Sequence, residues 1–508
     1  MSKVTYQADV PTLMTVCDAK QLNNGILGTL VCNNLVEDSR QVQAGDLFIA
    51  RPGLESDGRR YIHQAVQKGA IAVLVEAHDI DQFAQATNCT VPLYSVENLA
   101  SQLGNIANYF YNSPSHELTV IGITGTNGKT TCCQMIARSL AAMGHKVALM
   151  GTLGNGFVED LVDSPNTTLD ALSMHRLLAE YRDAGAKYVC MEVSSHALAQ
   201  GRVNSVNFDV AVFTNLSRDH LDYHGDMDSY AEAKKCLFKY PDLKSVVINS
   251  DDRVGNEILN DTEIQVDKYC FCITRINALY EQNSIYTEAV DFNDDGIKAE
   301  LVTPWGEAVM TTNLIGQFNL SNCLAVITTL GAIGLDLNDS LDALKILPAV
   351  TGRMECYGGS EQPMVVIDYA HTPDALMHAL KALRPHTKHR LHCVFGCGGD
   401  RDRGKRSEMA AIAEEFADNV ILTSDNPRGE AIEEIIKEMQ TGLLNPRSVS
   451  VKADRKEAID FTINRAVIGD LVLVAGKGHE AYQFIGNEKH KHSDIDWVRK
   501  VLAKGNWS

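Results

Sequence analysis

The sequence lacks any segment that would lead the chain into a membrane or out of the cell. Residues 1–20 contain Asp9, Pro11 and Asp18 and have no continuous apolar stretch, which argues against a secretory signal. Apolar runs such as residues 471–475 have the length of a strand, far short of the ~20 residues that cross a bilayer. We therefore expect a cytoplasmic protein with no membrane partner.

Positive charge is also scarce. The chain has 46 lysine and arginine residues against 65 aspartate and glutamate residues, a formal net charge of −19 at pH 7. General nucleic-acid binding needs a basic surface that displaces counterions from phosphates, so this class is excluded. Any anionic small molecule that the protein binds must therefore meet cations that are clustered at one site.

The cysteines do not form a recognisable disulfide or zinc pattern. Their number, 13, is odd, and Cys393 and Cys397 lack a second pair at zinc spacing. In a large chain without a signal we expect reduced thiols, with these two as small buried hydrophobic groups. The tract 489–492, Lys-His-Lys-His, is interpreted as a solvated basic turn rather than a metal site.

Length and composition indicate a packed globular enzyme with several domains. At about 150 residues per domain, a chain of 508 residues should hold roughly three. The 45% hydrophobic and 22% charged residues are close to the average for globular proteins. Low-complexity linkers and short repeats are absent from the sequence, and we place the domains at residues 1–98, 99–348 and 349–508.

The apolar runs predict an α/β fold in each domain. Residues 47–95 alternate strand-like runs with a helical stretch, which indicates a small N-terminal α/β domain. From Leu118 a strand, a glycine turn, a helix and further apolar runs indicate a central P-loop-type ATPase domain with a parallel sheet. After Pro348, four strands each end in a polar loop, which predicts a Rossmann-like C-terminal domain whose loops converge on one crevice.

Residues 119–131, TVIGITGTNGKTT, predict a phosphate-binding loop. A strand leads into a glycine turn whose backbone amides face phosphate oxygens, Lys129 supplies a cation, and the Thr130 hydroxyl can bind Mg²⁺. The strict pattern has glycine where Ile123 stands, so the motif is a variant. We expect ATP to be bound by Gly125, Thr126, Asn127, Gly128, Lys129, Thr130 and Thr131.

Further motifs extend this likeness along nearly the whole chain. TGTNGKTT is followed by MEVSSH, TNLSRDHLDYHG, GQFN, GRME and DYAHTP, with DSRQVQAGDLF near the start and DNPR near the end. In this ordered set the chain resembles the Mur ligase family, and within it the branch that forms the tripeptide. The resemblance implies ATP-dependent addition of meso-2,6-diaminopimelate to UDP-N-acetylmuramoyl-L-alanyl-D-glutamate through an acyl phosphate, in peptidoglycan synthesis.

The resemblance also implies which residues act on the nucleotide and its Mg²⁺. Lys234 matches a lysine that the family carries as a carbamate, N6-carboxylysine, which replaces a cation by an anion. The implied metal-binding residues are Thr130, Glu192, His220 and Lys234. The implied catalytic residues are Lys129, Glu192, His220, Lys234, Asn319, Arg353 and Asp368.

For the UDP-linked substrate the resemblance implies hydroxyl, amide and arginine side chains in the first two domains. The first domain departs from the enterobacterial form at Glu37 and at residues 54–56, Leu-Glu-Ser, so the uridine contacts are left open. The implied residues are Ser39, Asn166, Thr167, Thr168, Ser194, Gln200 and Arg202.

For the incoming amino acid the implied residues all follow strands of the third domain. An arginine fork matches a carboxylate in bidentate geometry, and diaminopimelate has a second carboxylate that lysine lacks. Arg428 would therefore select diaminopimelate. The implied residues are Arg401, Asp425, Asn426, Pro427, Arg428, Gly476 and Glu480.

Three alternatives remain open on the sequence. A ligase of the same family could add L-lysine, because only the amino acid differs. A folylpolyglutamate synthase shares the loop variant, but its loop lies near the N-terminus, whereas about 120 residues precede it here. A protein that binds ATP without turnover is the third. We expect a monomer with no nucleic-acid partner.

Overall fold

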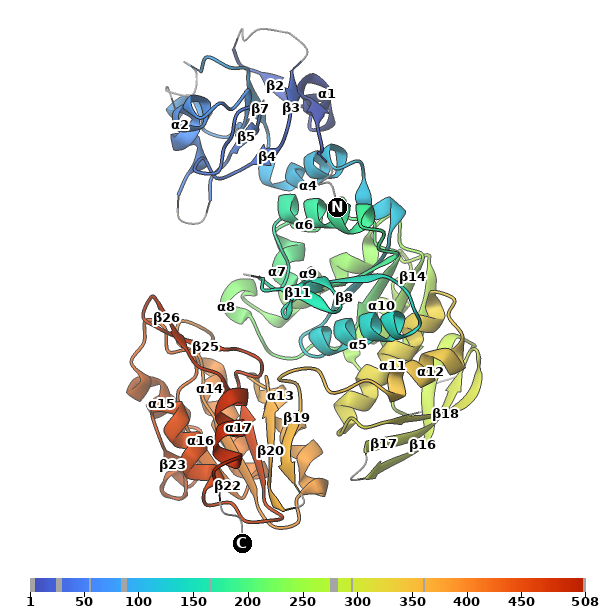
Figure 1. Ribbon diagram of the computed structural model, residues 1–508, viewed down its shortest axis with the longest axis vertical. Helices are drawn as coiled ribbons and strands as arrows, with labels where there is room; N and C mark the ends of the chain where they lie inside the picture. The colour runs from blue at the N-terminus through green and yellow to red at the C-terminus, as the bar shows by residue number, and fades with distance from the viewer. Residues whose placement is uncertain are drawn as a thin grey trace. The chain divides into compact units, whose positions relative to one another are not determined.

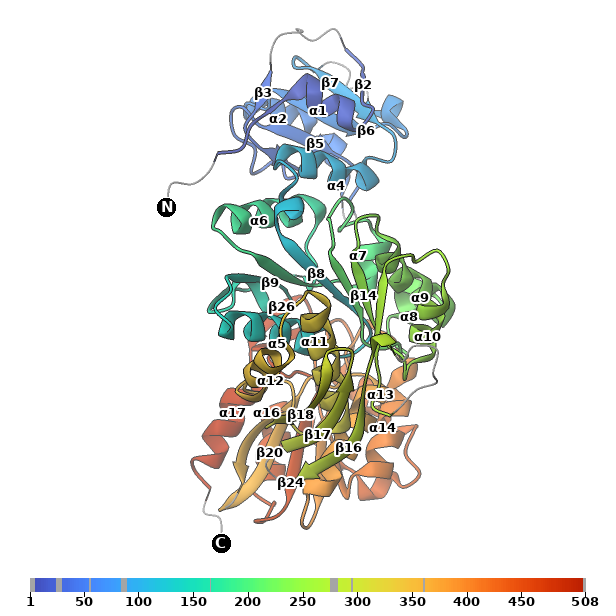
Figure 2. The ribbon, with the colours of Figure 1, turned by 90° about the vertical axis from the view of Figure 1, so that its right-hand side faces the viewer.

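The computed structural model shows a chain of α/β parts (Figures 1 and 2). Among the described residues, no helix is long and apolar enough to cross a membrane. Leu54 and Glu55, two of the residues that depart from the enterobacterial form, lie outside the described part. The structure describes residues 5–23, 30–53, 56–83, 89–164, 166–274, 282–293, 296–359 and 361–505.

The chain divides into two compact units, and neither is one continuous segment. The first consists of Met1–Gly122, Gly144–Asp209 and Lys239–Lys244. The second consists of Ile123–Met143, Val210–Phe238 and Ser245–Ser508. The phosphate-binding loop therefore belongs to the second unit, although the strand that leads into it begins in the first.

The N-terminal part of the first unit is a sheet with helices on both faces. Its strand order is β2-β7-β6-β5-β4, and the strands from β7 to β4 are parallel. In β5, Leu47 and Ile49 pack toward α1 and α4, whereas Phe48 and Ala50 pack toward α2. Successive strand side chains point to opposite faces, so these continuous apolar runs fit a sheet that is buried on both sides. The elements are β1 (Ala8–Asp9), α1 (Val10–Val16), β2 (Lys20–Gln21), β3 (Val31–Cys32), β4 (Leu35–Val36), β5 (Leu47–Ala50), α2 (Ile62–Gln67), β6 (Ala72–Glu76), β7 (Leu93–Val96) and α4 (Leu99–Phe110).

The rest of the first unit holds a second group of strands. Their order is β11-β10-β9-β12-β8; β9 and β12 are parallel, and β10 and β11 form an antiparallel extension. Glu192 is the last residue of β12, and the Ser194 side chain caps α7 by accepting from Ala197 N. The elements are β8 (Thr119–Thr124), β9 (Val147–Gly151), β10 (Gly154–Phe157), β11 (Asp160–Val162), α6 (Ala171–Asp183), β12 (Tyr188–Glu192) and α7 (Ser195–Ala199).

In the second unit, strands β13 to β16 are parallel, and β17 and β18 continue as antiparallel neighbours (Figure 2). Helix α11 is buried along most of its length and packs against α5, α12, β14 and β15. The elements are α5 (Lys129–Ala142), β13 (Val210–Phe213), α8 (Leu221–His224), α9 (Met227–Lys235), β14 (Ser245–Asn249), α10 (Arg253–Asn260), β15 (Asp267–Phe271), β16 (Ser284–Asn293), β17 (Gly296–Thr303), β18 (Gly306–Thr312), α11 (Gln317–Ala332) and α12 (Leu337–Lys345).

The C-terminal sheet of the second unit has the order β19-β20-β24-β21-β22-β23, and its four central strands are parallel. Leu471 and Leu473 pack toward α13, α14 and α15, whereas Val472 and Val474 pack toward α16 and α17. The elements are β19 (Glu355–Gly359), β20 (Gln362–Asp368), α13 (Pro373–Leu383), β21 (Leu391–Phe395), α14 (Gly404–Phe416), β22 (Asn419–Leu422), α15 (Ile432–Gln440), β23 (Ser450–Val451), α16 (Arg455–Ile463), β24 (Leu471–Ala475), β25 (Tyr482–Ile485), β26 (Glu488–Lys491) and α17 (Asp494–Leu502).

Arg455, which forms a buried ion pair, connects the ends of strands β22 and β24. Arg455 and Asp494 meet at 2.7 Å, and both side chains are fully buried. The Arg455 guanidinium also donates to the carbonyl oxygens of Ser424 and Ala475, the residues just before two predicted site positions. His492 is buried and lies 2.7 Å from Asp494. The interpretation of residues 489–492 as a solvated basic turn therefore holds only in part. Lys489 to Lys491 are exposed but lie in strand β26 rather than in a turn, and His492 is buried because it pairs with Asp494.

We predict that Asp494→Asn lowers the free energy of unfolding of this part of the protein by about 3 to 5 kcal/mol, because a buried arginine loses its counter-charge. Urea unfolding followed by circular dichroism measures the change. The matched control is Asp418→Asn, whose partner Arg384 is almost half exposed, and it should cost at most about 1 kcal/mol. Equal effects of the two substitutions would contradict the assignment.

Candidate active site

The phosphate-binding loop leaves no room for side chains at two glycines. Gly125 and Gly128 both have positive φ, and a Cβ atom at Gly125 would overlap Thr214 Oγ1. At Gly128 a Cβ atom would lie 2.6 Å from Asn322 Oδ1. Ile123, where the strict motif has glycine, is still in β8 and is buried. The turn thus begins after the strand, which explains why the variant motif tolerates isoleucine.

The loop after β13 supports the phosphate-binding loop from one side. Thr214 Oγ1 donates to Asn127 O at 2.6 Å, and Asn127 N donates to Asn215 Oδ1 at 2.9 Å. Ser217 N donates to Thr126 Oγ1 at 3.0 Å. The TNLS segment of the sequence therefore has a structural role: it fixes the path of the nucleotide-binding backbone.

Two lysines converge on one carbonyl oxygen of this loop. Lys129 Nζ and Lys234 Nζ donate to Gly125 O at 2.9 Å and 2.7 Å. Lys234 is only 1% exposed, and its Nζ lies 4.6 Å from the centroid of the Tyr230 ring. Burial, and then the charge of Lys129, hold the pKa of Lys234 well below its ordinary value. The expectation that helix α9 carries an unusual lysine beside the nucleotide site thus has a physical basis.

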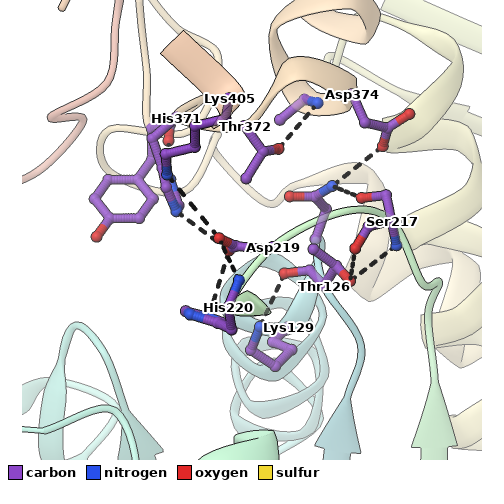
Figure 3. Close-up of polar contacts among 12 residues, drawn as sticks. Thr126, Lys129, Ser217, Asp219, His220, His371, Thr372, Asp374 and Lys405 are labelled. Atoms are coloured by element: carbon purple, nitrogen blue, oxygen red, sulfur yellow. Dashed lines mark hydrogen bonds and ion pairs between the residues drawn. The ribbon is translucent and has the colours of Figure 1, made fainter. Parts of the chain in front are cut away.

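A buried carboxylate, Asp219, joins the loop after β13 to the C-terminal part of the same unit (Figure 3). Asp219 Oδ2 lies 3.4 Å from His220 Nε2 and 3.7 Å from His371 Nε2, and Oδ1 lies 4.0 Å from Lys405 Nζ. Burial favours the neutral acid, but His371, His220 and Lys405 together hold the pKa of Asp219 well below its usual range. Asp219 is therefore an anion that gathers three basic side chains beside the phosphate-binding loop.

The structure also brings Arg353 to this loop, and Asp368 holds the backbone next to Arg353. Arg353 Nη2 donates to Thr130 Oγ1 at 3.1 Å, while its buried Nε has no hydrogen-bond partner. The two oxygens of Asp368 accept from Met354 N and Ala370 N, both at 2.8 Å. Burial raises the pKa of Asp368, and Arg353 opposes that shift. An arginine with a spare donor is suited to receive an anionic ligand.

Two polar residues of this site were missed by the sequence reasoning. Asn322 is three residues after Asn319 on α11, donates to Asn319 Oδ1 at 3.4 Å, and borders Gly128. The signal was present, since residues three apart on a helix share a face. Asp374 accepts from Asn127 Nδ2 at 3.3 Å (Figure 3). Asp374 follows a proline at the start of α13, where a helix cap is the ordinary interpretation.

The residues implied for the UDP-linked substrate belong to the first unit, as does Glu192. Thr168 Oγ1 donates to Glu192 O at 2.8 Å and accepts from Ser194 N at 3.1 Å. Thr152 N donates to Glu192 Oε1 at 2.8 Å. Further polar contacts within this unit join Thr152 with Thr167, Arg202 with Gln200 and Thr168 O, Ser164 with Asn166 O, Ser39 with Gln64, and Glu37 with Arg51.

In the C-terminal sheet, two arginines meet beside a glycine. A Cβ atom at Gly398 would lie 3.0 Å from Arg428 Nη1 and 3.8 Å from Arg401 Cγ. Arg428 has a φ of +50° and donates to Gly399 O at 2.9 Å. Burial, and then the charge of Arg401, lower the pKa of Arg428. Two like charges held together in a partly buried place favour an anionic ligand.

Acidic and amide groups lie at the neighbouring strand ends. Glu480 Oε2 accepts from Lys477 Nζ at 2.7 Å and from Asn426 Nδ2 at 2.9 Å. A Cβ atom at Gly476 would lie 2.6 Å from Asp425 Oδ2, so a side chain there would displace the carboxylate. The predicted convergence of these loops follows from the parallel strands β20, β24, β21 and β22, whose carboxyl ends share one edge. Anionic and cationic groups at one edge of the sheet suit a zwitterionic ligand.

A phosphate-binding loop, together with a cluster of opposite charges at the strand ends of the C-terminal sheet, is typical of an ATP-dependent acid–amino-acid ligase. Comparison with known proteins specifies the family. The Mur ligase family catalytic domain matches residues 33–111, the Mur ligase middle domain matches residues 123–330, and the glutamate ligase domain matches residues 352–478.

Individual relatives match along almost the whole chain. The UDP-N-acetylmuramoyl-L-alanyl-D-glutamate--2,6-diaminopimelate ligase of Coxiella burnetii is 46% identical over 96% of this chain and 99% of the relative. The ligase of the same name from Pseudomonas aeruginosa is 47% identical over 93% of this chain and 96% of its own. A solved structure of a ligase of that name has a TM-score of 0.68, with 34% identity over 97% and 98% of the two chains.

The chain belongs to the Mur ligase family. The predicted α/β fold with an N-terminal, a middle ATPase and a C-terminal part is confirmed. The exact domain boundaries and the individual roles of the site residues stay predictions.

We predict that Lys129→Ala reduces ligase turnover by ~10² or more and leaves the fold intact, because Lys129 neutralises phosphate charge and does not fill the core. Phosphate release with all substrates present measures turnover, and circular dichroism checks the fold. Lys345→Ala, at an exposed lysine of α12, is the control and should behave as wild type. A folded Lys129→Ala protein with near-normal turnover would show that the role is misassigned.

Proposed function

We propose that the protein adds meso-2,6-diaminopimelate to UDP-N-acetylmuramoyl-L-alanyl-D-glutamate, with conversion of ATP to ADP and phosphate, in peptidoglycan synthesis. The observation that carries the proposal is the pair Arg401 and Arg428 at the strand ends beside Glu480. The relatives named above support it, since ligases of that name match more than nine tenths of the chain. We place this reaction in the cytoplasm and expect the protein to act as a monomer.

The reaction has two bond-forming steps. In the first, a carboxylate oxygen of the D-glutamate residue attacks the γ-phosphorus of ATP, the bond to the bridging oxygen breaks, and ADP leaves. In the second, the amine attacks the carbonyl carbon of the acyl phosphate, phosphate leaves with the electron pair of its bond, and the nitrogen loses a proton. Both steps depend mainly on positioning and charge neutralisation, which Lys129 and Arg353 can supply.

The donor groups of the nucleotide site fit Mg²⁺. Hydroxyl and carboxylate oxygens are the ligands that this ion prefers. We assign the Thr130 hydroxyl to it, with His220 as a further candidate, and Glu192, in the first unit, stays a metal ligand implied by the family resemblance. When bound, Mg²⁺ neutralises phosphate charge. Lys129 adds a further positive charge that neutralises the phosphates, and the Arg353 Nε, which has no hydrogen-bond partner, can donate to the terminal phosphate.

We assign a carbamate to Lys234. An amine reacts with carbon dioxide only when it is neutral, and burial together with Lys129 lowers the pKa of Lys234. The nitrogen of the neutral amine forms a bond to the carbon of CO₂ and releases one proton, so a neutral group is replaced by an anion. The product would add oxygen donors beside the phosphate-binding loop, where a second Mg²⁺ could be held.

We predict that Lys234 is carbamylated in bicarbonate solution and that Lys234→Ala is inactive. Nuclear magnetic resonance with ¹³C-bicarbonate should give a carbamate signal that decreases as the pH falls through the amine pKa, because the protonated amine does not react. Short carboxylic acids can replace the missing anion in part. The matched control is Lys235→Ala, since Lys235 is partly exposed and paired with Glu232 and Glu257. Full activity of Lys234→Ala without additive would refute the assignment.

Selection of the amino acid follows from the two arginines. Diaminopimelate presents a carboxylate to Arg428, whereas lysine would leave this partly buried guanidinium, already beside the like charge of Arg401, without that carboxylate. A buried charge deprived of its partner costs roughly 2 to 5 kcal/mol, and each 1.4 kcal/mol is about tenfold in affinity. A preference of ~10² to 10³ for diaminopimelate over L-lysine is therefore expected from this contact.

We predict that Arg428→Ala lowers kcat/KM for diaminopimelate by ~10² or more and changes the use of L-lysine little, because lysine has no group for the arginine to bind. Steady-state kinetics with both amino acids decide the matter, and Arg447→Ala, at an exposed arginine, is the control. Equal wild-type efficiencies for the two amino acids would favour the lysine-adding alternative.

One assay tests the proposed function as a whole. Phosphate release should require ATP, the UDP-linked dipeptide and diaminopimelate together. Release with a folate in place of the dipeptide would favour the folylpolyglutamate synthase alternative. ATP binding with no release under any combination would favour a protein that binds the nucleotide without turnover.

A further inference from the structure

The loop after β20 contains a tyrosine that none of the assigned roles uses. Tyr369 follows Asp368, and its ring centroid lies 4.7 Å from that of His371 and 5.4 Å from that of His479. Burial, and then the charge of Glu480, raise the pKa of Tyr369, so its hydroxyl keeps the proton and acts as a donor. A rigid aromatic residue in this place can hold two different neighbours at once.

On one side Tyr369 contacts the nucleotide site. The guanidinium carbon of Arg353 lies 4.4 Å from the centroid of the Tyr369 ring, a distance at which a cation is attracted to the ring face. The same guanidinium reaches Thr130 Oγ1, and its Nε is buried without a hydrogen-bond partner. The ring therefore sets the plane in which Arg353 faces the phosphate-binding loop.

On the other side Tyr369 contacts the amino-acid site. Its hydroxyl lies 3.5 Å from Glu480 Oε1, while Oε2 is held by Lys477 and Asn426 at 2.7 and 2.9 Å. Lys477 is fully buried, so one half of the carboxylate is anchored firmly. The contact between the Tyr369 hydroxyl and Glu480 Oε1 is longer, so its distance can change with the position of the ring.

The backbone around this tyrosine allows little independent movement. A Cβ atom at Gly478 would lie 2.6 Å from Gly352 O and 2.9 Å from Tyr369 Cβ. A Cβ atom at Gly352 would overlap His479 N. The segment that carries Arg353 and the loop that carries Glu480 are thus in direct backbone contact, with Tyr369 beside both. A movement of the Arg353 segment must therefore displace the Glu480 loop, because packed interiors have no spare volume.

We propose that Tyr369 is a positioning residue shared by the two sites: its ring orients Arg353, its hydroxyl orients Glu480, and nucleotide binding thereby raises the affinity for the diamino acid. The proposal rests on the proposed function, through the roles given to Arg353 and Glu480. By linkage, the diamino acid raises nucleotide affinity by the same factor.

Tyr369→Phe keeps the ring and removes the hydroxyl. KM for diaminopimelate should rise about 3- to 10-fold, the range of one net hydrogen bond, while kcat and KM for ATP stay within about twofold. A merely structural role would instead lower the thermal midpoint and change all parameters together. The control is Tyr269→Phe. Tyr269 lies in β15, and its ring stacks on that of Trp305, which lies between β17 and β18, away from the named site residues. An unchanged KM for diaminopimelate would overturn the proposal.

A double-substitution cycle shows whether the hydroxyl acts through Glu480. If it does, Tyr369→Phe should add nothing to the KM of Glu480→Gln, because the contact is already altered. Additive effects of the two substitutions would mean that the hydroxyl acts elsewhere, and the proposal would fail.

Calorimetry measures the coupling itself. With the UDP-linked dipeptide present, a nonhydrolysable ATP analogue should tighten diaminopimelate binding to wild type by about fivefold or more. Tyr369→Leu should lose most of that factor; should this variant not fold, Tyr369→Phe carries the comparison. Equal affinities with and without the analogue in wild type would overturn the coupling. A wild type that does not use diaminopimelate at all would refute the proposed function instead, so the two failures are distinguishable.

Discussion

The site depends on the carbonyl oxygen of Gly125. Lys129 and Lys234 both donate to it. Thr214 Oγ1 lies where a side chain at residue 125 would be, so glycine is needed there. Two amines on one acceptor repel each other, and burial adds to the cost of charging the deeper one. One lysine thereby remains a cation for phosphate while the other is disposed to be neutral. The chemistry proposed for Lys234 follows from that division.

The second unit combines this loop with the ends of a separate parallel sheet. Asp219 collects His220, His371 and Lys405, and Arg353 reaches Thr130 from the segment before β19. Except for the contact between Asp219 and His220, each of these contacts pairs a group from the middle part with one from the C-terminal part. A ligase must bring an activated carboxylate to an amine, and polar contacts of this kind hold the two binding regions in a defined relation.

Much of the fold was predictable, because its strands are continuous apolar runs that end in polar or glycine-rich loops. The phosphate-binding loop and the four strand ends of the C-terminal sheet were placed correctly from such patterns. Asn322 was predictable in principle from its helical spacing to Asn319 but was overlooked. The burial of His492 was not predictable, because its partner Asp494 in turn depends on Arg455, which is 39 residues away in the sequence.

The sequence by itself determined the class of fold, the nucleotide-binding motif and the family, because these depend on the order and spacing of residues that are close in the chain. Tertiary structure alone decided the contacts made by single side chains. Tyr369 lies one residue from a recognised position, yet nothing local relates it to Arg353 and Glu480. The neutral tendency of Lys234 likewise comes from burial and from Lys129, 105 positions earlier in the numbering of the chain. Desolvation and charge proximity are properties of packing, and packing exists only once distant segments have met.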